Sequence, residues 1–315
     1  MINSVRNTVL SVLNKNNYGY ISPSDFNLYA KQAQLEILED YFASYNKTIN
    51  LENSRMSGTD YADERKRIEE AMETFAVTDY LDPVLPLPSN SYYLPSVIYN
   101  GNDYFMLNKV VCYPIQVATG FNSAVGASQL IDATANFIAS GVQVGDIVIR
   151  YNANFIAKVT AVTSATVLSL DTNIFFGTPE QYFIFSGRTI REAEKVTHGK
   201  ITMLNNSMLT APSINYPAYT QEYDKLTVYP SSINNRGQIV ANYFRYPFDP
   251  KWTYITLVSG EPSFDQTQPD YQDFELPIED ETRLIMKILQ YCGISIREGE
   301  VYQFAKTEEN QDKAQ

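Results

Sequence analysis

The fold expected for this chain is decided by one β-rich stretch, Leu130-Ile-Asp-Ala-Thr-Ala-Asn-Phe-Ile-Ala-Ser-Gly-Val-Gln-Val-Gly-Asp-Ile-Val-Ile149, and its continuation, Ala157-Lys-Val-Thr-Ala-Val-Thr-Ser-Ala-Thr-Val-Leu-Ser-Leu170. Short runs of alternating apolar and polar residues are broken by Gly141, Gly145 and Asp146. This pattern is typical of short antiparallel strands joined by turns. We therefore expect residues 121–185, here called the β cassette, to form an all-β domain of barrel or sandwich type inserted into a different protein.

Both ends of the chain are predicted to be helical. Apolar residues recur at helical spacing over residues 2–13. A second helix should begin at Ser22, because Ser22 is a favourable N-cap, Pro23 suits the first helical position and Asp25 follows three residues after the cap. It should extend to about Tyr45. A third helix is expected from 60 to 75, and a last one from 279 to 292, where three acidic residues suit the positive end of the helix dipole.

The helix predicted over 22–45 has apolar residues on two sides. One stripe contains Phe26, Ala30, Ala33, Ile37 and Tyr41, and the other contains Leu28, Leu35, Leu38 and Phe42. A helix on the surface of a globular protein needs only one such stripe. The second neighbour is therefore either another helix of the same bundle or another subunit.

Between the helices, the sequence predicts strands at 104–107, 110–113, 216–219, 225–229 and 238–246, a short helix around 189–196 and a long polar loop at 260–275. The fold class is expected to be α+β, with helical termini, a β-containing body and the inserted cassette. The expected division has residues 1–120 as the N-terminal helices and first part of the body, 121–185 as the insertion, and 186–315 as the second part of the body with the C-terminal helix and a polar tail.

The composition disfavours disorder and nucleic-acid binding. Of 315 residues, 44% are hydrophobic, and the formal net charge is −12. The longest basic cluster, Arg65-Lys66-Arg67, is flanked by Glu64 and Glu69, so we interpret it as a charge-balanced helix surface rather than a phosphate-binding patch. The 24 tyrosines against one tryptophan suit half-buried strands as well as wet protein interfaces.

The sequence predicts a protein made in a reducing cytoplasm. Its two cysteines, Cys112 and Cys292, form neither a disulfide framework nor a metal-binding pair. No signal peptide is visible at the start, and no apolar stretch approaches the length that spans a bilayer. We therefore expect no membrane partner.

The search for catalytic chemistry selects no residue. His198 is the only histidine, and a dyad of Cys112 with His198 is disfavoured because Cys112 lies in an apolar run. No spacing selects an acid–base pair from the carboxylates near predicted turns, which are Asp103, Asp132, Asp146, Asp171, Asp224, Asp249 and Glu261. We expect no catalytic, cofactor-binding or metal-binding residue, no cofactor, and no enzymatic activity.

Several strings distributed over both ends and the body carry a family resemblance. They are Met1-Ile-Asn-Ser-Val-Arg-Asn-Thr-Val-Leu10, Asn17-Tyr-Gly-Tyr-Ile-Ser-Pro-Ser-Asp-Phe-Asn-Leu-Tyr-Ala-Lys-Gln-Ala-Gln34, Leu209-Thr-Ala-Pro-Ser213, Leu226-Thr-Val-Tyr-Pro230, Tyr246-Pro-Phe-Asp-Pro-Lys-Trp252 and Tyr271-Gln-Asp-Phe-Glu-Leu-Pro-Ile-Glu-Asp280. Together they resemble the head–tail connector, or neck ring, proteins of crAss-like and related Bacteroidetes tailed bacteriophages. The cassette also resembles a β module of phage structural proteins.

The resemblance implies a structural virion protein at the head–tail junction, made in the cytoplasm of the host bacterium. It implies rings of about twelve identical subunits between the portal and the tail, closed by heterologous contacts between neighbours. The partners would be further copies of the chain, the portal protein and adjacent tail or ring proteins. Packaged DNA would pass through the lumen without specific binding, and an acidic wall would repel its phosphates. The helices at 22–45 and 279–292 are the expected core of that assembly.

Two other functions stay open from the residues. One is a tail-associated receptor- or glycan-binding protein that uses the cassette as its binding module. The other is a tail glycosidase built on an unrecognised carboxylate pair. The helical termini disfavour both, and so does the single Trp252, because sugar sites favour tryptophan platforms.

Overall fold

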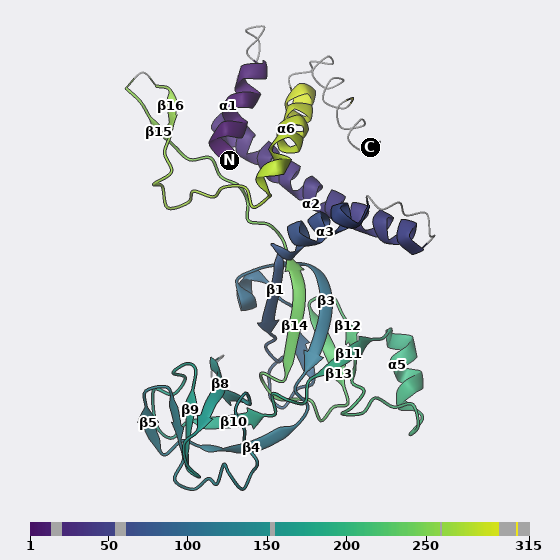
Figure 1. The fold of residues 1–315 in the computed structure, drawn as a ribbon, viewed down its shortest axis with the longest axis vertical. Helices are drawn as coiled ribbons and strands as arrows, with labels where there is room; N and C mark the ends of the chain where they lie inside the picture. The colour runs from purple at the N-terminus through teal and green to yellow at the C-terminus, as the bar shows by residue number, and fades with distance from the viewer. Residues whose placement is uncertain (14–20, 54–60, 152–154, 259, 296–306, 308–315) are drawn as a thin grey trace. The chain divides into compact units, whose positions relative to one another are not determined.

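A computed structural model describes residues 1–13, 21–53, 61–151, 155–258, 260–295 and 307. The chain has an α+β fold and divides into two compact units (Figure 1). The helical unit contains residues 1–76 and 246–315, and the β unit contains residues 77–245. Among the described helices, none combines the length and the apolar character that crossing a bilayer requires.

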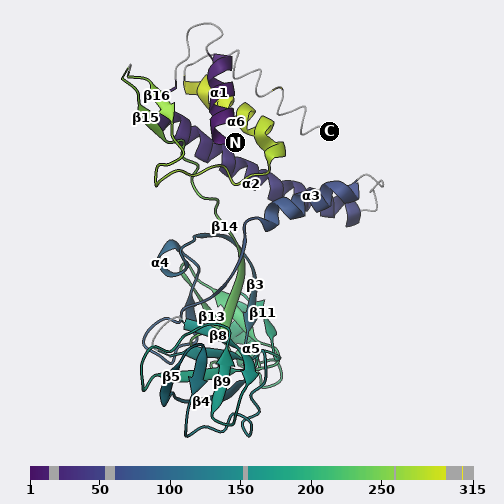
Figure 2. The same ribbon diagram turned by 60° about the vertical axis from the view of Figure 1, so that its left-hand side comes forward.

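The helical unit is built around α2 (Pro23–Asn53). Its other elements are α1 (Ile2–Leu13), α3 (Tyr61–Glu73), the 3₁₀ turn η2 (Ile278–Asp280), α6 (Glu281–Ser295) and a hairpin of β15 (Tyr254–Thr256) and β16 (Pro262–Phe264). Helix α2 contacts both α6 and α3, and α6 also contacts α1 (Figure 2). The expected cap is confirmed, because the Ser22 hydroxyl accepts a hydrogen bond from the Asp25 amide at 3.1 Å. The helix continues well past Tyr45, where it was expected to end.

The two apolar sides of α2 are used differently. Every residue of the first stripe is buried, from Phe26 to Tyr41. In the second stripe Leu38 is buried, but Leu28 keeps 62% of its surface exposed. Helices of the same chain therefore cover the first side, whereas the second side is covered only in part, with Leu35 and Phe42 half-buried. Burial in one chain does not decide between a neighbouring helix and another subunit on that side.

The β unit contains a seven-stranded body sheet in the order β1-β14-β3-β11-β12-β13-β2. Its strands are β1 (Ala76–Tyr80), β2 (Ser91–Tyr93), β3 (Tyr104–Cys112), β11 (Arg191–Lys195), β12 (Ala218–Gln221), β13 (Lys225–Tyr229) and β14 (Ile239–Arg245). Two short helices accompany it, α4 (Val97–Asn100) and α5 (His198–Asn205). Strands β11 and β12 run parallel. Fully buried Tyr92, Val110, Leu226 and Val228 belong to the core of this sheet.

Three predictions about the body were wrong in detail. The strands expected at 104–107 and 110–113 are one strand, β3. The helix expected around 189–196 is instead β11, in which Ala193 is buried between exposed Glu192 and Glu194. Exposure on both sides of one buried residue is the alternation of a strand. Hydrogen bonding to β3 and β12 holds residues 191–195 in this extended conformation. The polar loop expected at 260–275 contains β16.

A second antiparallel sheet has seven strands in the order β4-β10-β7-β8-β9-β6-β5. They are β4 (Gln116–Phe121), β5 (Ala124–Gly126), β6 (Gln129–Ile131), β7 (Ile147–Arg150), β8 (Phe155–Val162), β9 (Val167–Leu170) and β10 (Gln181–Phe185). Its core includes fully buried Leu130, Phe137, Leu168 and Tyr182. The predicted turns at Gly141 and Gly145 are present, because both residues have positive φ angles that favour glycine.

The two sheets of the β unit are packed together. Buried Ile147, Ile149 and Phe185 of the second sheet contact Tyr80 and Tyr113 of the body. Gly237 approaches Ile149 so closely that a Cβ on it would lie 2.1 Å from the Ile149 Cδ1 atom. The sequence predicted domain boundaries after residue 120 and after residue 185. In the structure the cassette and the strands that flank it form one compact unit, and the terminal helices form the other.

Candidate functional site

Cys112 and His198 lie in environments that do not suit a catalytic dyad. Cys112 on β3 is fully buried, and burial raises the pKa of its thiol to about 12. A nucleophilic cysteine needs the opposite shift, because the thiolate is the reactive form. His198 is exposed as the first residue of α5. The other cysteine, Cys292 on α6, is also buried, and burial raises the pKa of its thiol to about 12.

Four of the carboxylates near turns, those of Asp103, Asp146, Asp171 and Asp249, bind backbone amides or pair with a cation. Asp103 accepts from the Val97 amide, Asp171 from the Lys158 amide, and Asp249 pairs with Lys31. Buried Asp146 accepts from the amides of Gln143 and Gly187 at 2.8 and 3.1 Å. Asp224 and Glu261 accept backbone hydrogen bonds through their carbonyl oxygens. Within the described residues, no group of three or more His, Cys, Asp or Glu side chains could hold a metal ion.

Asp132 is the most enclosed of these carboxylates apart from Asp146. It is 2% exposed, and it accepts from the Thr134 amide at 2.8 Å and from the Tyr182 hydroxyl at 2.7 Å. Burial opposes its ionisation, but these hydrogen bonds outweigh burial and lower the pKa of Asp132. Burial, then the Asp132 carboxylate, raise the pKa of Tyr182. The pair therefore stabilises the cassette core rather than offering a group for proton transfer.

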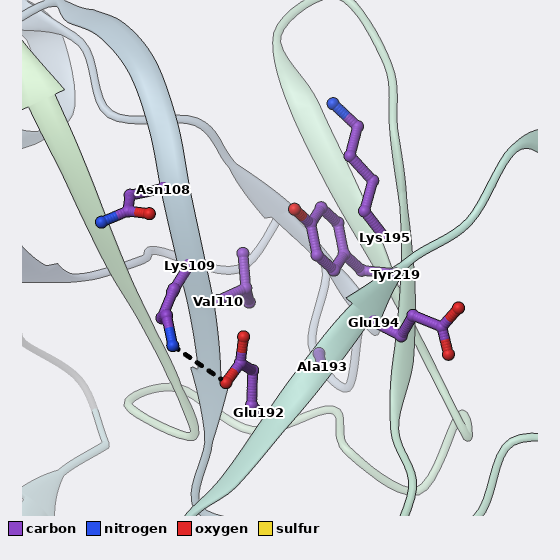
Figure 3. A pocket seen from close by; sticks show the side chains of 8 residues that line it. All are labelled: Asn108, Lys109, Val110, Glu192, Ala193, Glu194, Lys195 and Tyr219. Carbon is purple, nitrogen blue, oxygen red and sulfur yellow. Dashed lines mark hydrogen bonds and ion pairs between the residues drawn. The ribbon is translucent and has the colours of Figure 1, made fainter. Parts of the chain in front are cut away.

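A hollow of about 420 Å³ lies against β3, β11 and β12 (Figure 3). Its lining residues are Asn108, Lys109, Val110, Glu192, Ala193, Glu194, Lys195 and Tyr219. Lys109 pairs with Glu192 at 3.2 Å, and the Lys195 ammonium donates to the Gln221 side chain at 2.6 Å. The adjacent hollow is lined by Lys195, Val196, Thr197, His198 and Gln221. In both hollows the polar side chains pair with each other, as Lys109 does with Glu192 and Lys195 with Gln221. Neither hollow therefore has polar groups that converge on a space for a substrate.

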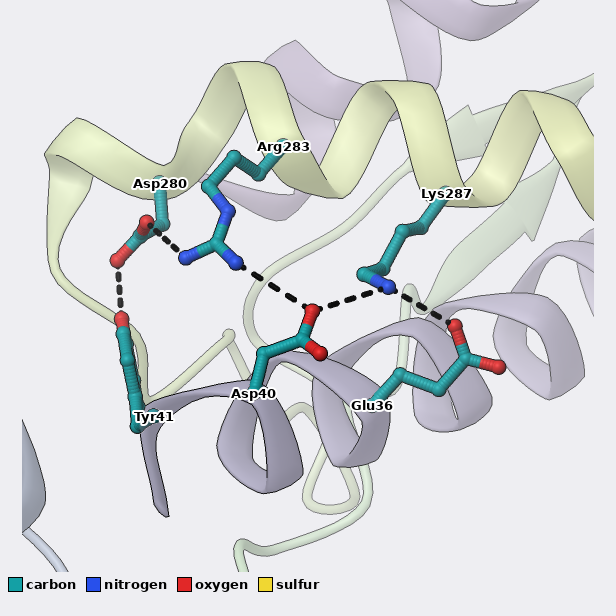
Figure 4. A network of polar contacts seen from close by, with 6 residues as sticks. All are labelled: Glu36, Asp40, Tyr41, Asp280, Arg283 and Lys287. Atoms are coloured by element: carbon teal, nitrogen blue, oxygen red, sulfur yellow. Dashed lines mark hydrogen bonds and ion pairs between the residues drawn. The ribbon is translucent and has the colours of Figure 1, made fainter. Parts of the chain in front are cut away.

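A network of charged side chains joins α2 to α6 (Figure 4). The Tyr41 hydroxyl donates to Asp280, and Arg283 contacts Asp280 at 3.3 Å and Asp40 at 3.4 Å. Lys287, 6% exposed in its side chain, contacts Asp40 at 3.3 Å. The Lys287 ammonium also contacts Glu36 at 3.1 Å. The two helices expected to form the core of an assembly thus have their facing surfaces occupied within one chain.

The hairpin of β15 and β16 is anchored at its base and exposed beyond it. Trp252, 2% exposed, stacks on Tyr254 and Phe264, and the Arg6 guanidinium lies 3.8 Å from the centre of its ring. Beyond this base, Ile255 and Leu257 are about half exposed, at 48% and 46%, and Val258 is fully exposed. We call residues 254–258 and 260–264 the arm.

A second exposed apolar segment in the β unit begins within α5 and continues beyond it. Ile201 packs this helix against Val196 and Ala218. Leu204 also packs against this small core, but Met203, Met208, Leu209 and Tyr216 each keep at least 75% of their surface exposed. We call residues 201–217 the methionine loop. Large exposed apolar patches on soluble proteins mark interaction sites.

Secondary-structure patterns alone did not predict either segment, although the residues contain a signal for them. The run Tyr254-Ile-Thr-Leu-Val258 alternates like a strand but is short and follows prolines. The methionine loop contains no Asp, Glu, Lys or Arg over 17 consecutive residues, 201 to 217. An uncharged apolar segment in an acidic chain is a signal that does not depend on secondary structure.

Comparison with known proteins adds no relative. No family model matches the chain, and no curated protein is significantly similar to it.

Proposed function

We propose that this protein is a structural virion protein that forms a ring in the neck of a tailed bacteriophage, between the portal and the tail. The ring would contain about twelve copies and form part of the conduit through which DNA is retained and ejected. The proposal rests on the sequence resemblance to neck ring proteins. It predicts self-association and binding to the portal protein rather than catalysis.

The structural observation that supports the proposal is the exposure of two apolar segments on an acidic protein, the arm with Glu261 as its one charged side chain and the methionine loop with none. Of the described large apolar side chains other than tyrosine, Val258, Met208 and Leu209 are the most exposed. A protein with a net charge of −12 resists self-association through most of its surface. Segments with little or no charge are therefore the places where copies can meet.

The acidic charge also suits a DNA conduit. A negative wall repels phosphates, so DNA would slide past it without binding. A ring whose inner wall proved neutral or basic would contradict this part of the proposal.

The deciding experiment is the native mass of the purified chain, alone and after mixing with the portal protein. A change from one subunit to a closed ring of about twelve supports the connector function. A stable trimer, or no assembly with any capsid component, contradicts it. Because many rings form only on a template, the mixture with the portal is the decisive sample.

One observation favours the second candidate, a tail-associated receptor- or glycan-binding protein. On the second sheet, the guanidinium of Arg150 lies 4.6 Å from the ring centre of Phe155 and 5.5 Å from that of Phe176. Both rings are exposed, and Glu180 pairs with Arg150 at 2.9 Å. Exposed aromatic rings beside a charged pair can bind a sugar face. A copy number that is a multiple of three, and glycan binding lost in Phe176→Ala, would favour this candidate.

A further inference from the structure

We propose that the helical unit, rather than the β unit, lines the lumen of the ring and forms its acidic wall. The inference rests on the ring proposed above and names the part of the chain that faces DNA. The helical unit has 25 Asp and Glu residues against 14 Lys and Arg, a formal charge of −11. The β unit has 11 against 10, a formal charge of −1. Almost all of the net charge of the chain is therefore in the helical unit.

One segment of the helical unit holds much of this charge. Residues 252–282 contain eight Asp and Glu residues and no Lys, Arg or His. Part of the charge is used inside the unit, since Asp273 accepts from the Ile2 amide at 2.8 Å. Other members are at the surface, as Glu279 is, whose side chain keeps 66% of its surface exposed. The segment therefore contributes an excess of negative charge that its own residues do not balance.

The cations of the helical unit are largely neutralised by its own carboxylates. Seven lysine and arginine side chains form ion pairs within the unit, and they are Lys31, Arg65, Lys66, Arg67, Lys251, Arg283 and Lys287. Arg6 is instead buried against the Trp252 ring. Because DNA is held by cations that neutralise its phosphates, such a surface gives DNA few places to bind. A duplex would slide along it rather than adhere.

The β unit has cations that phosphates could reach. Lys158 and Lys195 are exposed, and Lys195 donates to the uncharged Gln221 side chain. Arg191 donates to the Ile190 carbonyl. Within the described residues, none of these three cations is paired with a carboxylate. A lumen wall made from this unit would present such cations about twelve times around the duplex and would hold its phosphates.

Screening by salt requires the acidic unit to lie at the surface of the lumen. At physiological ionic strength the field of an exposed charge falls off over about 8 Å. Carboxylates behind another protein layer would be too far from the duplex to repel it. A nearly neutral β unit facing the DNA would leave the wall without its charge. The helical unit can therefore act on DNA only if it faces the duplex directly.

Labelling of introduced cysteines in the assembled ring tests which unit lines the lumen. Native Cys112 and Cys292 are buried, and burial raises the pKa of both thiols to about 12, so introduced cysteines are the reactive ones. Glu39→Cys, Glu73→Cys and Glu279→Cys put a thiol at exposed positions of α2, α3 and η2. Each variant of the full chain is treated with a small maleimide and, separately, with a maleimide carried on a gold particle several times wider than a DNA duplex. Both reactions are run on the chain alone and on the ring formed with the portal.

A lumen shaped for DNA admits the small reagent and excludes the particle. All variants should react with both reagents when alone. In the ring, we expect at least one of the three helical positions to keep its reaction with the small maleimide and to lose its reaction with the particle. The matched controls are Ile138→Cys, Glu194→Cys and Tyr223→Cys, at exposed positions of the β unit. None of the controls should show this selective loss.

The proposal is overturned if no helical position shows the selective loss in the ring. Reaction with both reagents would mean that the acidic surface faces outward, and loss of both reactions would mean that a partner protein covers it. Selective loss at a β position would also overturn the proposal, because the β unit would then line the lumen. In each of these cases the ring has formed and the proposed function stands. If the wild type forms no ring with the portal, the proposed function itself fails.

Discussion

Asp280 in the helical unit and Asp132 in the β unit are both buried, and each accepts a hydrogen bond from a buried tyrosine. Their surroundings differ. Asp280 is neutralised by a cation, Arg283, within the network that continues to Lys287. Asp132 is satisfied by neutral donors, the Thr134 amide and hydroxyl together with Tyr182. The helical unit thus depends on balanced charges between two helices, whereas the cassette depends on hydrogen bonds within one apolar core.

The largest effect is expected when the charge balance is broken. Lys287→Met leaves Glu36 and Asp40 facing each other without the ammonium that joins them. Removal of one partner of a buried ion pair is strongly destabilising, and because both carboxylates are partly exposed we expect a loss of about 2–3 kcal/mol. Urea unfolding, with hydrogen exchange of α2 and α6 peptides, measures it.

Lys31→Met is the matched control for that variant. Lys31 pairs with Asp249 at 2.7 Å, but both side chains are more than half exposed. Exposed pairs contribute about 0–1 kcal/mol. Equal losses in the two variants would mean that the network between α2 and α6 has no special stabilising role.

The two tyrosines should respond differently to removal of their hydroxyl groups. Tyr182→Phe leaves one oxygen of buried Asp132 without its donor, which costs about 1–3 kcal/mol. Tyr41→Phe should cost less, about 1 kcal/mol, because Arg283 still neutralises Asp280. Chemical denaturation of both variants makes the comparison. If Tyr41→Phe lost more unfolding free energy than Tyr182→Phe, Asp280 would depend on its tyrosine more than Asp132 does, which would contradict the comparison.

Much of this comparison was beyond sequence analysis, although most of the elements were not. The cap at Ser22 and the turns at Gly141 and Gly145 are local signals, and they predicted their elements correctly. Asp132, Tyr182, Glu36 and Lys287 meet partners that are distant in the chain, so their roles depend on packing. The error at β11 has the same origin, because a charged segment with helical propensity is paired as a strand by its neighbours.

Acid should affect the cassette through Asp132. Hydrogen bonds outweigh burial and lower its pKa in the folded state, so its stabilising contribution is complete above the unfolded value of about 4. That contribution is lost as the pH falls through the folded value. Asp132→Asn should be less stable than wild type at neutral pH, with the difference shrinking in acid. Hydrogen exchange of cassette peptides from pH 6 to pH 3 follows it, and a constant difference would contradict this origin.

Added salt should give the smallest change in stability, and it should affect the helical unit but not the core of the cassette. Raising the salt concentration from about 0.1 to 1 M shortens the screening length from about 10 to 3 Å, which weakens partly exposed ion pairs. The α2–α6 contact should lose a few tenths of a kcal/mol. The donors to Asp132 among the described residues are neutral, so the core around Asp132 and Tyr182 should be unaffected. Hydrogen exchange of the two regions in one sample provides the test.

The way the chain passes into and out of the second sheet has a consequence for how the β unit assembles. Strands β3 and β11 are paired neighbours, with Cys112 opposite Arg191, and β4 and β10 are paired next to them, with Gln116 opposite Phe185. Once the cassette has folded, its two ends lie side by side. The cassette then connects β3 to β11 as a tight turn would. If a flexible linker of roughly seventy residues replaced the cassette, the loss of chain entropy would raise the free-energy cost of pairing β3 with β11 by about 2–3 kcal/mol. The cassette could therefore be shortened or enlarged away from the body with little penalty to the body sheet, provided that Ile147, Ile149 and Phe185 keep their contacts with Tyr80 and Tyr113.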